Sequence, residues 1–375
     1  MEDDGERTLI RTARGQVPAP QLREGWLHYL VFTDEAGAPQ RLTLIPGVPL
    51  RIGRRAPCEM LLRDSEVSGV HCELLLRGDD LMVSDSGSTN GTFVDGKRVF
   101  ANELVPMGGV LQVGRQILKH EFRDQQEVAQ NEELERDLAR ASRYMQSLLP
   151  PPLRSGPLRV EWYFQPCAGV GGDGFGYHPI DEHHWLMYVL DVSGHGVGAA
   201  MHVSSVLNTL RQQTLQGADL TQPAQVLARL NALFQMDSHD GMFLTAWYGV
   251  YDQRSRSLHY ASAGHHPAYV LPAGGGELRP LQTRNMVIGA LPDTAYLGAS
   301  TVLGHGERLY LFSDGVFEIV TQDGHNWGLP DFLQLLGRPH DPGVSEPEHL
   351  FGVVRSLARP GPLDDDFSIL VMTLP

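Results

Sequence analysis

The stretch Trp185-Leu-Met-Tyr-Val-Leu-Asp191-Val-Ser-Gly-His-Gly196 decides how the C-terminal half of this chain folds. A hydrophobic run of β-forming residues ends in an aspartate and glycines, the pattern of a strand that presents a carboxylate at its end. Carboxylates that are brought together repel one another unless cations neutralise them, and Mg²⁺ and Mn²⁺ prefer oxygen ligands. A two-metal hydrolase is therefore predicted from four aspartates in comparable positions: Asp173, Asp191, Asp314 and Asp365.

The sequence around this stretch, residues 154–375, alternates between strand-like and helical segments. Strand-like runs are 162–165, 185–191, 244–251, 257–263, 268–271, 307–313 and 367–373, and helical segments are 198–215, 223–234, 330–336 and 346–358. Short turns between neighbouring strands, such as residues 253–257, indicate antiparallel pairing. The pattern predicts a layered α+β domain.

A single long helix is expected before this domain, within a linker of residues 123–153. Leu134, Leu138, Ala141, Met145 and Leu148 recur at helical spacing between residues 125 and 149, and Pro150-Pro151-Pro152 ends the helix. An amphipathic helix must bury its apolar stripe. It can pack on its own domain or pair with a second copy as a short coiled coil, which would make a homodimer.

The N-terminal part of the chain reads as all-β. Between residues 26 and 122, short β-type runs alternate with turn signals such as Asn90-Gly91 and Asp95-Gly96, which predicts a β-sandwich. Residues 1–25 contain Pro18, Pro20 and scattered charges, and we expect them to form a disordered tail.

The composition of the chain argues against several classes of partner and site. The chain has 375 residues, 42% of them hydrophobic, and a formal net charge of −15, which argues against a nucleic-acid or anionic-membrane surface and favours a protein partner. Cys58, Cys72 and Cys167 lack CxxC spacing, so neither a disulfide framework nor a zinc site is indicated. No run of about 18 apolar residues and no signal peptide is found, which predicts a cytoplasmic protein.

Three motifs in the N-terminal part resemble those of a forkhead-associated (FHA) domain. They are Arg51-Ile-Gly-Arg54, Val67-Ser-Gly-Val-His-Cys72 and Asp85-Ser-Gly-Ser-Thr-Asn-Gly-Thr-Phe-Val-Asp-Gly96. The resemblance implies a phosphothreonine-peptide reader in which Arg54 and Ser68 hold the phosphate, Asn90 contacts the peptide backbone and His71 supports the loops. A guanidinium and a hydroxyl suit phosphate recognition. The family often has an arginine where Gly69 stands here.

The C-terminal half resembles the PP2C-like (PPM) serine/threonine phosphatases, in particular the bacterial SpoIIE and RsbU type. Besides the aspartates, Gln146-Ser-Leu-Leu-Pro150, Gly264-His-His-Pro267 and Leu311-Phe-Ser-Asp-Gly-Val316 are typical of that branch. The resemblance implies an α-β-β-α arrangement of antiparallel sheets and two Mn²⁺ or Mg²⁺ ions. Asp173 would bind one ion, Asp191 would bridge both with help from the Val192 carbonyl, and Asp314 and Asp365 would bind the other.

This sequence departs from the family pattern at several positions. Gly174 and Gly176 stand where an aromatic residue and a second acid often follow the first aspartate. Ser193 occupies the position of a histidine proposed as leaving-group acid in eukaryotic relatives, and His195 lies two residues on, so that His195 is either that acid or a residue that stabilises the loop. His183-His184 is expected in a hairpin turn, and His265-His266 is expected to be structural.

These features predict a cytoplasmic, metal-dependent phosphatase that acts on phosphoserine or phosphothreonine proteins, with the FHA domain directing it to phosphorylated partners. The alternative is a phosphoprotein-binding scaffold whose metal site has decayed. The intact set of four aspartates speaks against that alternative, whereas Gly174 and Gly176 leave it open. A nucleotide-binding enzyme is set aside because no GxxxxGK[ST] loop is found.

Overall fold

The computed structural model describes residues 26–34, 37–156 and 158–375. The predicted tail, residues 1–25, lies outside these ranges. The chain divides between Glu135 and Arg136 into two compact units, and this division falls inside helix α1 (Gln125–Leu148).

The first unit is the predicted β-sandwich. One of its sheets has the strand order β2-β1-β11-β10-β7-β8 and the other β4-β3-β5-β6-β9. The buried side chains of the two sheets meet in one core that includes Leu30, Ile52, Leu74 and Leu118. The strands are β1 (Trp26–Thr33), β2 (Pro39–Thr43), β3 (Leu50–Gly53), β4 (Met60–Leu61), β5 (Cys72–Arg77), β6 (Asp80–Asp85), β7 (Thr92–Val94), β8 (Lys97–Arg98), β9 (Glu103–Val105), β10 (Val110–Val113) and β11 (Gln116–Asp124).

Helix α1 begins directly after β11. The Asp124 carboxylate accepts hydrogen bonds from the backbone N–H groups of Gln126 (2.7 Å) and Glu127 (3.3 Å), which caps the first turn. The helix ends two residues before Pro150, as predicted. None of the helices in the described ranges has the length and apolar character needed to cross a bilayer.

The apolar stripe of α1 packs on the second unit. Met145 and Leu148 are buried in a core cluster of that unit, and Leu138 and Ala141 pack against it. Leu134, one helical repeat earlier, is 58% exposed. Of the two alternatives for this stripe, packing within the chain is observed from Leu138 onward, and pairing with a second copy remains a prediction.

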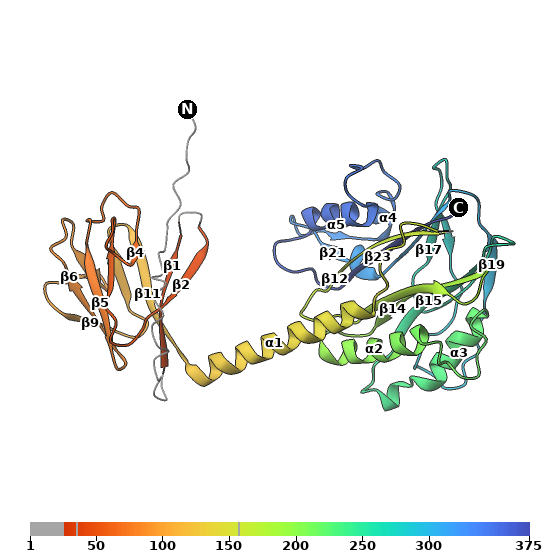
Figure 1. The fold of residues 1–375 in the computed structure, drawn as a ribbon, viewed down its shortest axis with the longest axis horizontal. Coiled ribbons are helices and arrows are strands. Elements are labelled where there is room, and N and C mark those ends of the chain that lie inside the picture. Colours follow the sequence, from red (N-terminus) through yellow and green to blue (C-terminus); the bar gives the residue numbers. More distant parts are fainter. Residues whose placement is uncertain (1–25, 35–36, 157) are drawn as a thin grey trace. The chain divides into compact units, whose positions relative to one another are not determined.

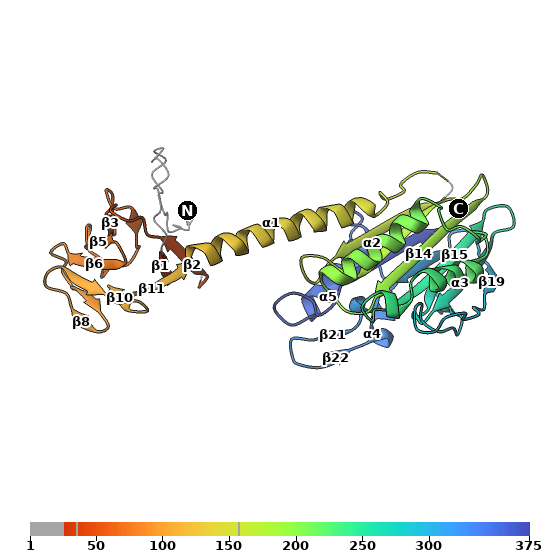
Figure 2. The same ribbon diagram turned by 90° about the horizontal axis from the view of Figure 1, so that it is seen from below.

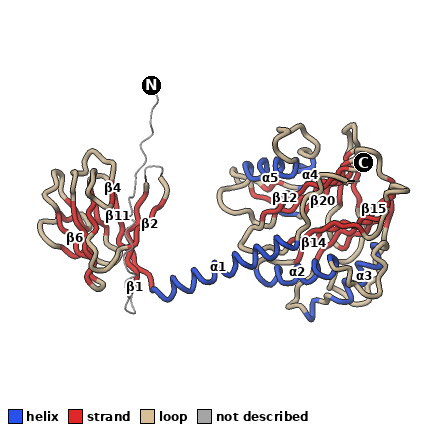
Figure 3. The backbone as a smooth tube through the Cα atoms, in the orientation of Figure 1, coloured by secondary structure: helices blue, strands red, loops and turns tan. Residues whose placement is uncertain are grey.

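The second unit contains two antiparallel sheets with helices on their outer faces (Figure 1). Their strand orders are β13-β14-β15-β16-β19 and β12-β23-β20-β17-β18. Side chains of both sheets, including Val189, Trp247, Leu309 and Leu370, form the core between them. Helices α2 and α3 cover the first sheet, and α4 and α5 lie on the second (Figure 3). The predicted α-β-β-α order is confirmed.

Where the sequence predicted a run, the bounds of the element follow it closely, whereas β13, β18, β19, β21 and β22 have no predicted counterpart. The strands are β12 (Arg159–Gln165), β13 (Asp173–Pro179), β14 (His184–Val192), β15 (Leu244–Asp252), β16 (Ser257–Ala263), β17 (Ala268–Leu271), β18 (Arg279–Leu281), β19 (Ala299–Val302), β20 (Arg308–Phe312), β21 (Ile319–Val320), β22 (Asn326–Trp327) and β23 (Phe367–Thr373). The helices are α2 (Val197–Arg211), α3 (Pro223–Leu233), α4 (Leu329–Leu333) and α5 (Glu346–Leu357), with short 3₁₀ turns at η1 (Met236–Ser238) and η2 (Asp314–Val316).

Strand β13 is an element that the sequence did not predict. It contains Gly174 and Gly176, and glycine is disfavoured in strands. At both positions the neighbouring side chains are too close to leave room for a Cβ atom. A Cβ on Gly174 would lie 2.8 Å from the Val203 side chain of α2, and a Cβ on Gly176 would lie 2.3 Å from the Tyr188 hydroxyl. The departure from the family pattern at these two positions therefore has a packing reason in this chain.

Candidate active site

The predicted phosphate-binding residues of the first unit lie on loops at one end of its strands. Arg54 directly follows β3, and its backbone N–H donates to the Ser68 carbonyl (2.9 Å). The Ser68 hydroxyl accepts a hydrogen bond from the Thr89 N–H (3.0 Å). The Arg54 side chain is exposed and makes no hydrogen bond or ion pair with any residue in the described ranges. Arg54 and Ser68 are thus brought together on adjacent loops.

His71 holds two of these loops in place. Its side chain is fully buried. The Ser68 N–H donates to Nδ1 (3.0 Å), so the ring proton lies on Nε2, which donates to the Gly91 carbonyl (3.1 Å). The Asn90 amide donates to the Glu66 carbonyl (2.8 Å), so one of its donors is used within the protein. The arrangement agrees with a supporting role for His71.

The four predicted aspartates of the second unit come in two pairs, one from each sheet. Asp173 opens β13 and Asp191 lies near the end of β14, and the two residues are directly opposite in the antiparallel register. Asp314 follows β20 and Asp365 precedes β23, and these two strands are antiparallel neighbours. The end of one strand therefore lies beside the start of the other.

Hydrogen bonds between the sheets hold the two pairs together. The Ser368 hydroxyl, at the start of β23, donates to Asp173 Oδ2 (2.5 Å), and both side chains are buried. The Asp366 carboxylate accepts from the backbone N–H groups of Cys167 (2.8 Å) and Asp173 (3.2 Å). A Cβ on Gly171 would lie 2.1 Å from Asp366 Oδ2, so only glycine fits there.

Burial and mutual repulsion raise the pKa values of the four carboxylic acids. Burial, then the charge of Asp191, raises the pKa of Asp173 well above its usual range. Burial, then the charges of Asp314 and Asp365, raises the pKa of Asp191 to about 7. Burial raises the pKa of Asp365 to about 6, and burial followed by the charge of Glu318 raises that of Asp314. A site of this kind favours bound cations, because they relieve this repulsion.

The donor set fits hard divalent cations. Asp173, Asp191, Asp314 and Asp365 offer carboxylate oxygens, and none of them pairs with a Lys or Arg side chain in the described part of the chain. Oxygen-only donor sets are those that Mg²⁺ and Mn²⁺ prefer. The Val192 backbone lies beside this set, since its N–H donates to the Gly172 carbonyl (3.2 Å).

Sequence reasoning missed two residues that shape this centre. These residues are Asp366 and Ser368. Within the run Asp364-Asp365-Asp366, Asp364 pairs with Arg359 at the surface, whereas Asp366 is buried and accepts hydrogen bonds from backbone N–H groups. Ser368 bridges the sheets. The Cys167 sulfur and one oxygen each of Asp365 and Asp366 lie within 4.8 Å of one another. These contacts join positions about 200 residues apart, so no local pattern could have indicated them.

The remaining polar residues near the centre are structural or stay as predictions. The Ser193 hydroxyl accepts from the Phe243 N–H (3.0 Å) and fixes the loop after β14. His195 is exposed, and its charge lowers the pKa of Asp365 against the larger effect of burial, so both of its predicted roles stay open. His265 and His266 are packed together with ring centroids 4.1 Å apart, and burial lowers the pKa of each.

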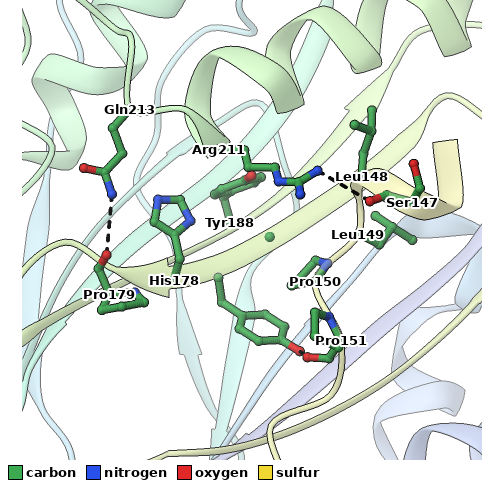
Figure 4. Close-up of a pocket in the computed structure, with 12 residues that line it drawn as sticks. Ser147, Leu148, Leu149, Pro150, Pro151, His178, Pro179, Tyr188, Arg211 and Gln213 are labelled. Atoms are coloured by element: carbon green, nitrogen blue, oxygen red, sulfur yellow. Dashed lines mark hydrogen bonds between the residues drawn. The ribbon is translucent and has the colours of Figure 1, made fainter. Parts of the chain in front are cut away.

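A cavity of about 490 Å³ lies toward the other end of β13. It is lined by the end of α1, by Gly176 to Pro179 and by Tyr188 and Arg211. Figure 4 shows the Arg211 guanidinium donating to the Ser147 carbonyl (3.4 Å) and Gln213 donating to the Pro179 carbonyl (3.5 Å). None of the four aspartates lines this cavity, so it belongs to the junction of α1 with the sheet.

The chain matches two family models. Residues 181–375 match "Stage II sporulation protein E (SpoIIE)", and residues 50–114 match "FHA domain". Among solved structures, the SiaA-PP2C domain of Pseudomonas aeruginosa has a TM-score of 0.58 and 22% identity and covers 68% of this chain and 100% of its own. At this identity the likeness concerns the fold alone.

Curated relatives match one or the other unit. Phosphoserine phosphatase RsbP of Bacillus subtilis is 29% identical over 184 residues, 49% of this chain and 45% of RsbP. Phosphoserine phosphatase RsbU of the same organism is 30% identical over 210 residues, 55% of this chain and 60% of RsbU. FHA domain-containing protein FhaB of Mycobacterium tuberculosis is 35% identical over 102 residues, 27% of this chain and 65% of FhaB. The chain thus spans about half the length of the two phosphatases.

Proposed function

The chain belongs to the stage II sporulation protein E (SpoIIE) family and carries an FHA domain, and from this premise we propose that it is a metal-dependent phosphatase of phosphoserine and phosphothreonine proteins. The FHA domain would bind a phosphothreonine-containing partner and so direct or regulate the phosphatase. We place this activity in the cytoplasm. The proposal is supported by the names of the relatives RsbP and RsbU and by the two pairs of carboxylates.

The carboxylate centre carries the proposal. Its acids come from two sheets, and burial together with the charges of neighbouring acids raises their pKa values, as is frequent at functional sites. Asp173 would hold one Mn²⁺ or Mg²⁺ ion, Asp191 with the Val192 carbonyl would bridge two, and Asp314 and Asp365 would hold the second. Two such ions, when bound, supply an activated water and neutralise charge on the phosphoryl group.

The chain's own residues would orient and hold this centre. Ser368 fixes the Asp173 carboxylate by a short hydrogen bond, and Asp366 fixes the backbone at Asp173. The Ser193 hydroxyl holds the loop that carries the Val192 carbonyl against the Phe243 backbone. His195, exposed on that loop, is the side chain within electrostatic reach of Asp365 that could give a proton to a leaving oxygen.

The test of the phosphatase activity is release of phosphate from a phosphothreonine peptide by the purified full chain with and without Mn²⁺. Asp191→Asn and Asp314→Asn should each lower kcat by a factor of at least about 100, because each removes a charged ligand. Asp364→Asn is the matched control, since Asp364 pairs with Arg359 at the surface. Turnover that survives in both ligand variants, or that needs no metal, would refute the proposal.

The FHA part is tested separately by peptide binding. The exposed Arg54 guanidinium beside the Ser68 loop supports phosphate recognition. Arg54→Ala should weaken binding of a phosphothreonine peptide by about tenfold or more, the scale of a lost charge-assisted hydrogen bond, whereas Arg77→Ala, an exposed arginine at the end of β5, should not. Equal affinity for the unphosphorylated peptide would contradict the assignment.

The alternative of a non-catalytic scaffold rests on Gly174 and Gly176. Their close contacts with Val203 and Tyr188 give both residues a packing role that does not require a decayed site. Metal-independent phosphopeptide binding without any turnover would favour the scaffold. Self-association through α1 also stays a prediction, to be tested by the mass of the full chain in solution; the exposed Leu134 marks the part of the stripe that is open to such a contact.

A further inference from the structure

The hairpin formed by β21 and β22 leads into α4 (Figure 2). Residues of this hairpin and of the start of α4 line a groove with a cavity of about 470 Å³. Phe317 and Ile319 are buried beneath it, and Trp327 and Leu329 are half-buried in its wall. Ile319 lies directly opposite Trp327 in the hairpin register. Trp327 also makes an edge contact with the buried Phe332 ring (6.1 Å between centroids), which orients it. The lining therefore combines these apolar side chains with polar atoms of the hairpin.

One residue of the groove lies in the same hydrogen-bonded turn as a residue of the carboxylate centre. Asp314 and Glu318 belong to one turn, in which the Glu318 N–H donates to the Asp314 carbonyl (2.8 Å). Glu318 therefore belongs both to the turn that carries Asp314 and to the lining of the groove.

Glu318 gives the groove its charge. Its side chain is exposed and makes no hydrogen bond or ion pair with the residues that the structure describes. It is the charged member of the lining, whose other side chains are apolar or neutral. A groove that offers apolar side chains and one carboxylate fits a long side chain with a hydrocarbon stem and a positive end, which can also lie over the face of a tryptophan.

We propose that this groove binds a Lys or Arg side chain of the phosphoprotein substrate, one to three residues away from the phosphorylated residue. The distance follows from geometry, because an extended peptide advances about 3.3 Å per residue and Glu318 is in the same turn as Asp314. This inference rests on the proposed phosphatase function. It adds a substrate preference that is determined by the β21–β22 hairpin.

The experiment compares phosphothreonine peptides that differ in one residue, Arg, Gln or Glu, placed in turn at each of the three positions on either side. Para-nitrophenyl phosphate, which has no flanking chain, serves as the small substrate. We expect kcat/KM of the wild type to be about fivefold to tenfold higher for the best-placed Arg peptide than for its Gln counterpart, the scale of an exposed ion pair with a cation–π contact. The Glu peptide should be the poorest substrate.

Glu318 variants test the cause of this preference through the ratio of kcat/KM values between peptides. Glu318→Gln should reduce the Arg-to-Gln ratio to near one, and Glu318→Lys should reverse it in favour of the Glu peptide. Trp327→Ala should remove part of the preference. Asp323→Lys is the matched control, because Asp323 lies at the hairpin tip, pairs with His325 and does not line the groove; its ratio should equal that of the wild type.

The outcomes separate this inference from the proposed function. Without metal-dependent hydrolysis of para-nitrophenyl phosphate, the proposed function itself fails. Hydrolysis with no preference among the peptides overturns the groove assignment alone. A Glu318→Gln variant that loses the same factor on every substrate, para-nitrophenyl phosphate included, also overturns it, because Glu318 would then act on the metal centre.

Discussion

Removal of the Ser368 hydroxyl is expected to weaken metal binding by about tenfold to a hundredfold. In the native protein this hydroxyl donates to Asp173 Oδ2 at 2.5 Å, and the side chains are 0% and 3% exposed. A buried hydrogen bond to a charged group contributes about 1.5–3 kcal/mol, and every 1.4 kcal/mol is a factor of ten in affinity. Loss of a partner that orients a metal ligand typically costs a similar factor.

The direction of the effect follows from the carboxylate. Ser368 stabilises the ionised form of Asp173, against the larger effect of burial. Without the hydroxyl, the carboxylate is more readily protonated and free to rotate, and a cation must displace the proton and fix the orientation. The Ser368→Ala variant should therefore bind Mn²⁺ more weakly in a calorimetric titration of the full chain.

The control is Ser356→Ala on α5, where the hydroxyl donates to the Val353 carbonyl on an exposed helix face. Its Mn²⁺ affinity should equal that of the wild type. Both variants should retain the wild-type circular dichroism spectrum, which excludes unfolding as the cause. A folded Ser368→Ala protein with wild-type Mn²⁺ affinity would refute the reasoning that Asp173 is a metal ligand held by this bond.

Three further predictions concern stability. Gly176→Ala places a methyl group 2.3 Å from the hydroxyl of the facing tyrosine and should destabilise the second unit by about 1–3 kcal/mol in urea unfolding. Met145→Ala, which empties a buried site under α1, should cost about 2–3 kcal/mol in the same assay, whereas Leu134→Ala, at a 58% exposed position, should change stability by less than about 0.5 kcal/mol. In the first unit, burial of Asp64 is outweighed by hydrogen bonds from Arg115 and neighbouring backbone, which lower the pKa of Asp64 to about 2. Asp64→Asn should therefore cost about 2 kcal/mol at pH 7, and hydrogen exchange should show this difference disappearing as the pH falls from about 4 to 2.

Each of these predictions has a contrary result. An unchanged midpoint for Gly176→Ala would mean that the tyrosine ring can move aside freely. Equal effects of the Met145 and Leu134 variants would contradict the packing of α1. A deficit of the Asp64→Asn protein that persists at pH 2 would show that the lost contribution does not come from the ionised carboxylate, because a lowered pKa stabilises the fold only above that pH range.

The sequence predicted those elements whose pattern is local. The continuous apolar runs of β14 and β15 and the helical spacing of Met145 and Leu148 were sufficient to predict these strands and this helix, whereas the α-β-β-α layer order came from the family resemblance. Strand β13 was missed because Gly174 and Gly176 are poor strand formers. The side chains that require glycine at these positions belong to α2 and β14, which no local pattern around β13 indicates.

In the candidate site, too, some residues could be predicted from local sequence and others could not. The aspartates could be proposed from strand ends and from resemblance, since each stands beside a recognisable local pattern. The Ser368 bond, the backbone acceptor Asp366 and the position of Glu318 at the groove could not, because they depend on the stacking of two sheets and on the β21–β22 hairpin. Whether the four aspartates bind metal remains a prediction.

The place of β23 in its sheet has a consequence for protein synthesis. This strand pairs with β12 on one side and β20 on the other, yet it follows every other described element in the sequence. Domains fold in the order in which the ribosome releases them. The FHA domain can therefore fold before β23, the strand that pairs with β12, has been synthesised. A growing chain, or one cut after Leu363, would hold three of the four aspartates but lack both Asp365 and Ser368. If the proposed roles hold, such a fragment would compete for phosphorylated partners without removing their phosphate.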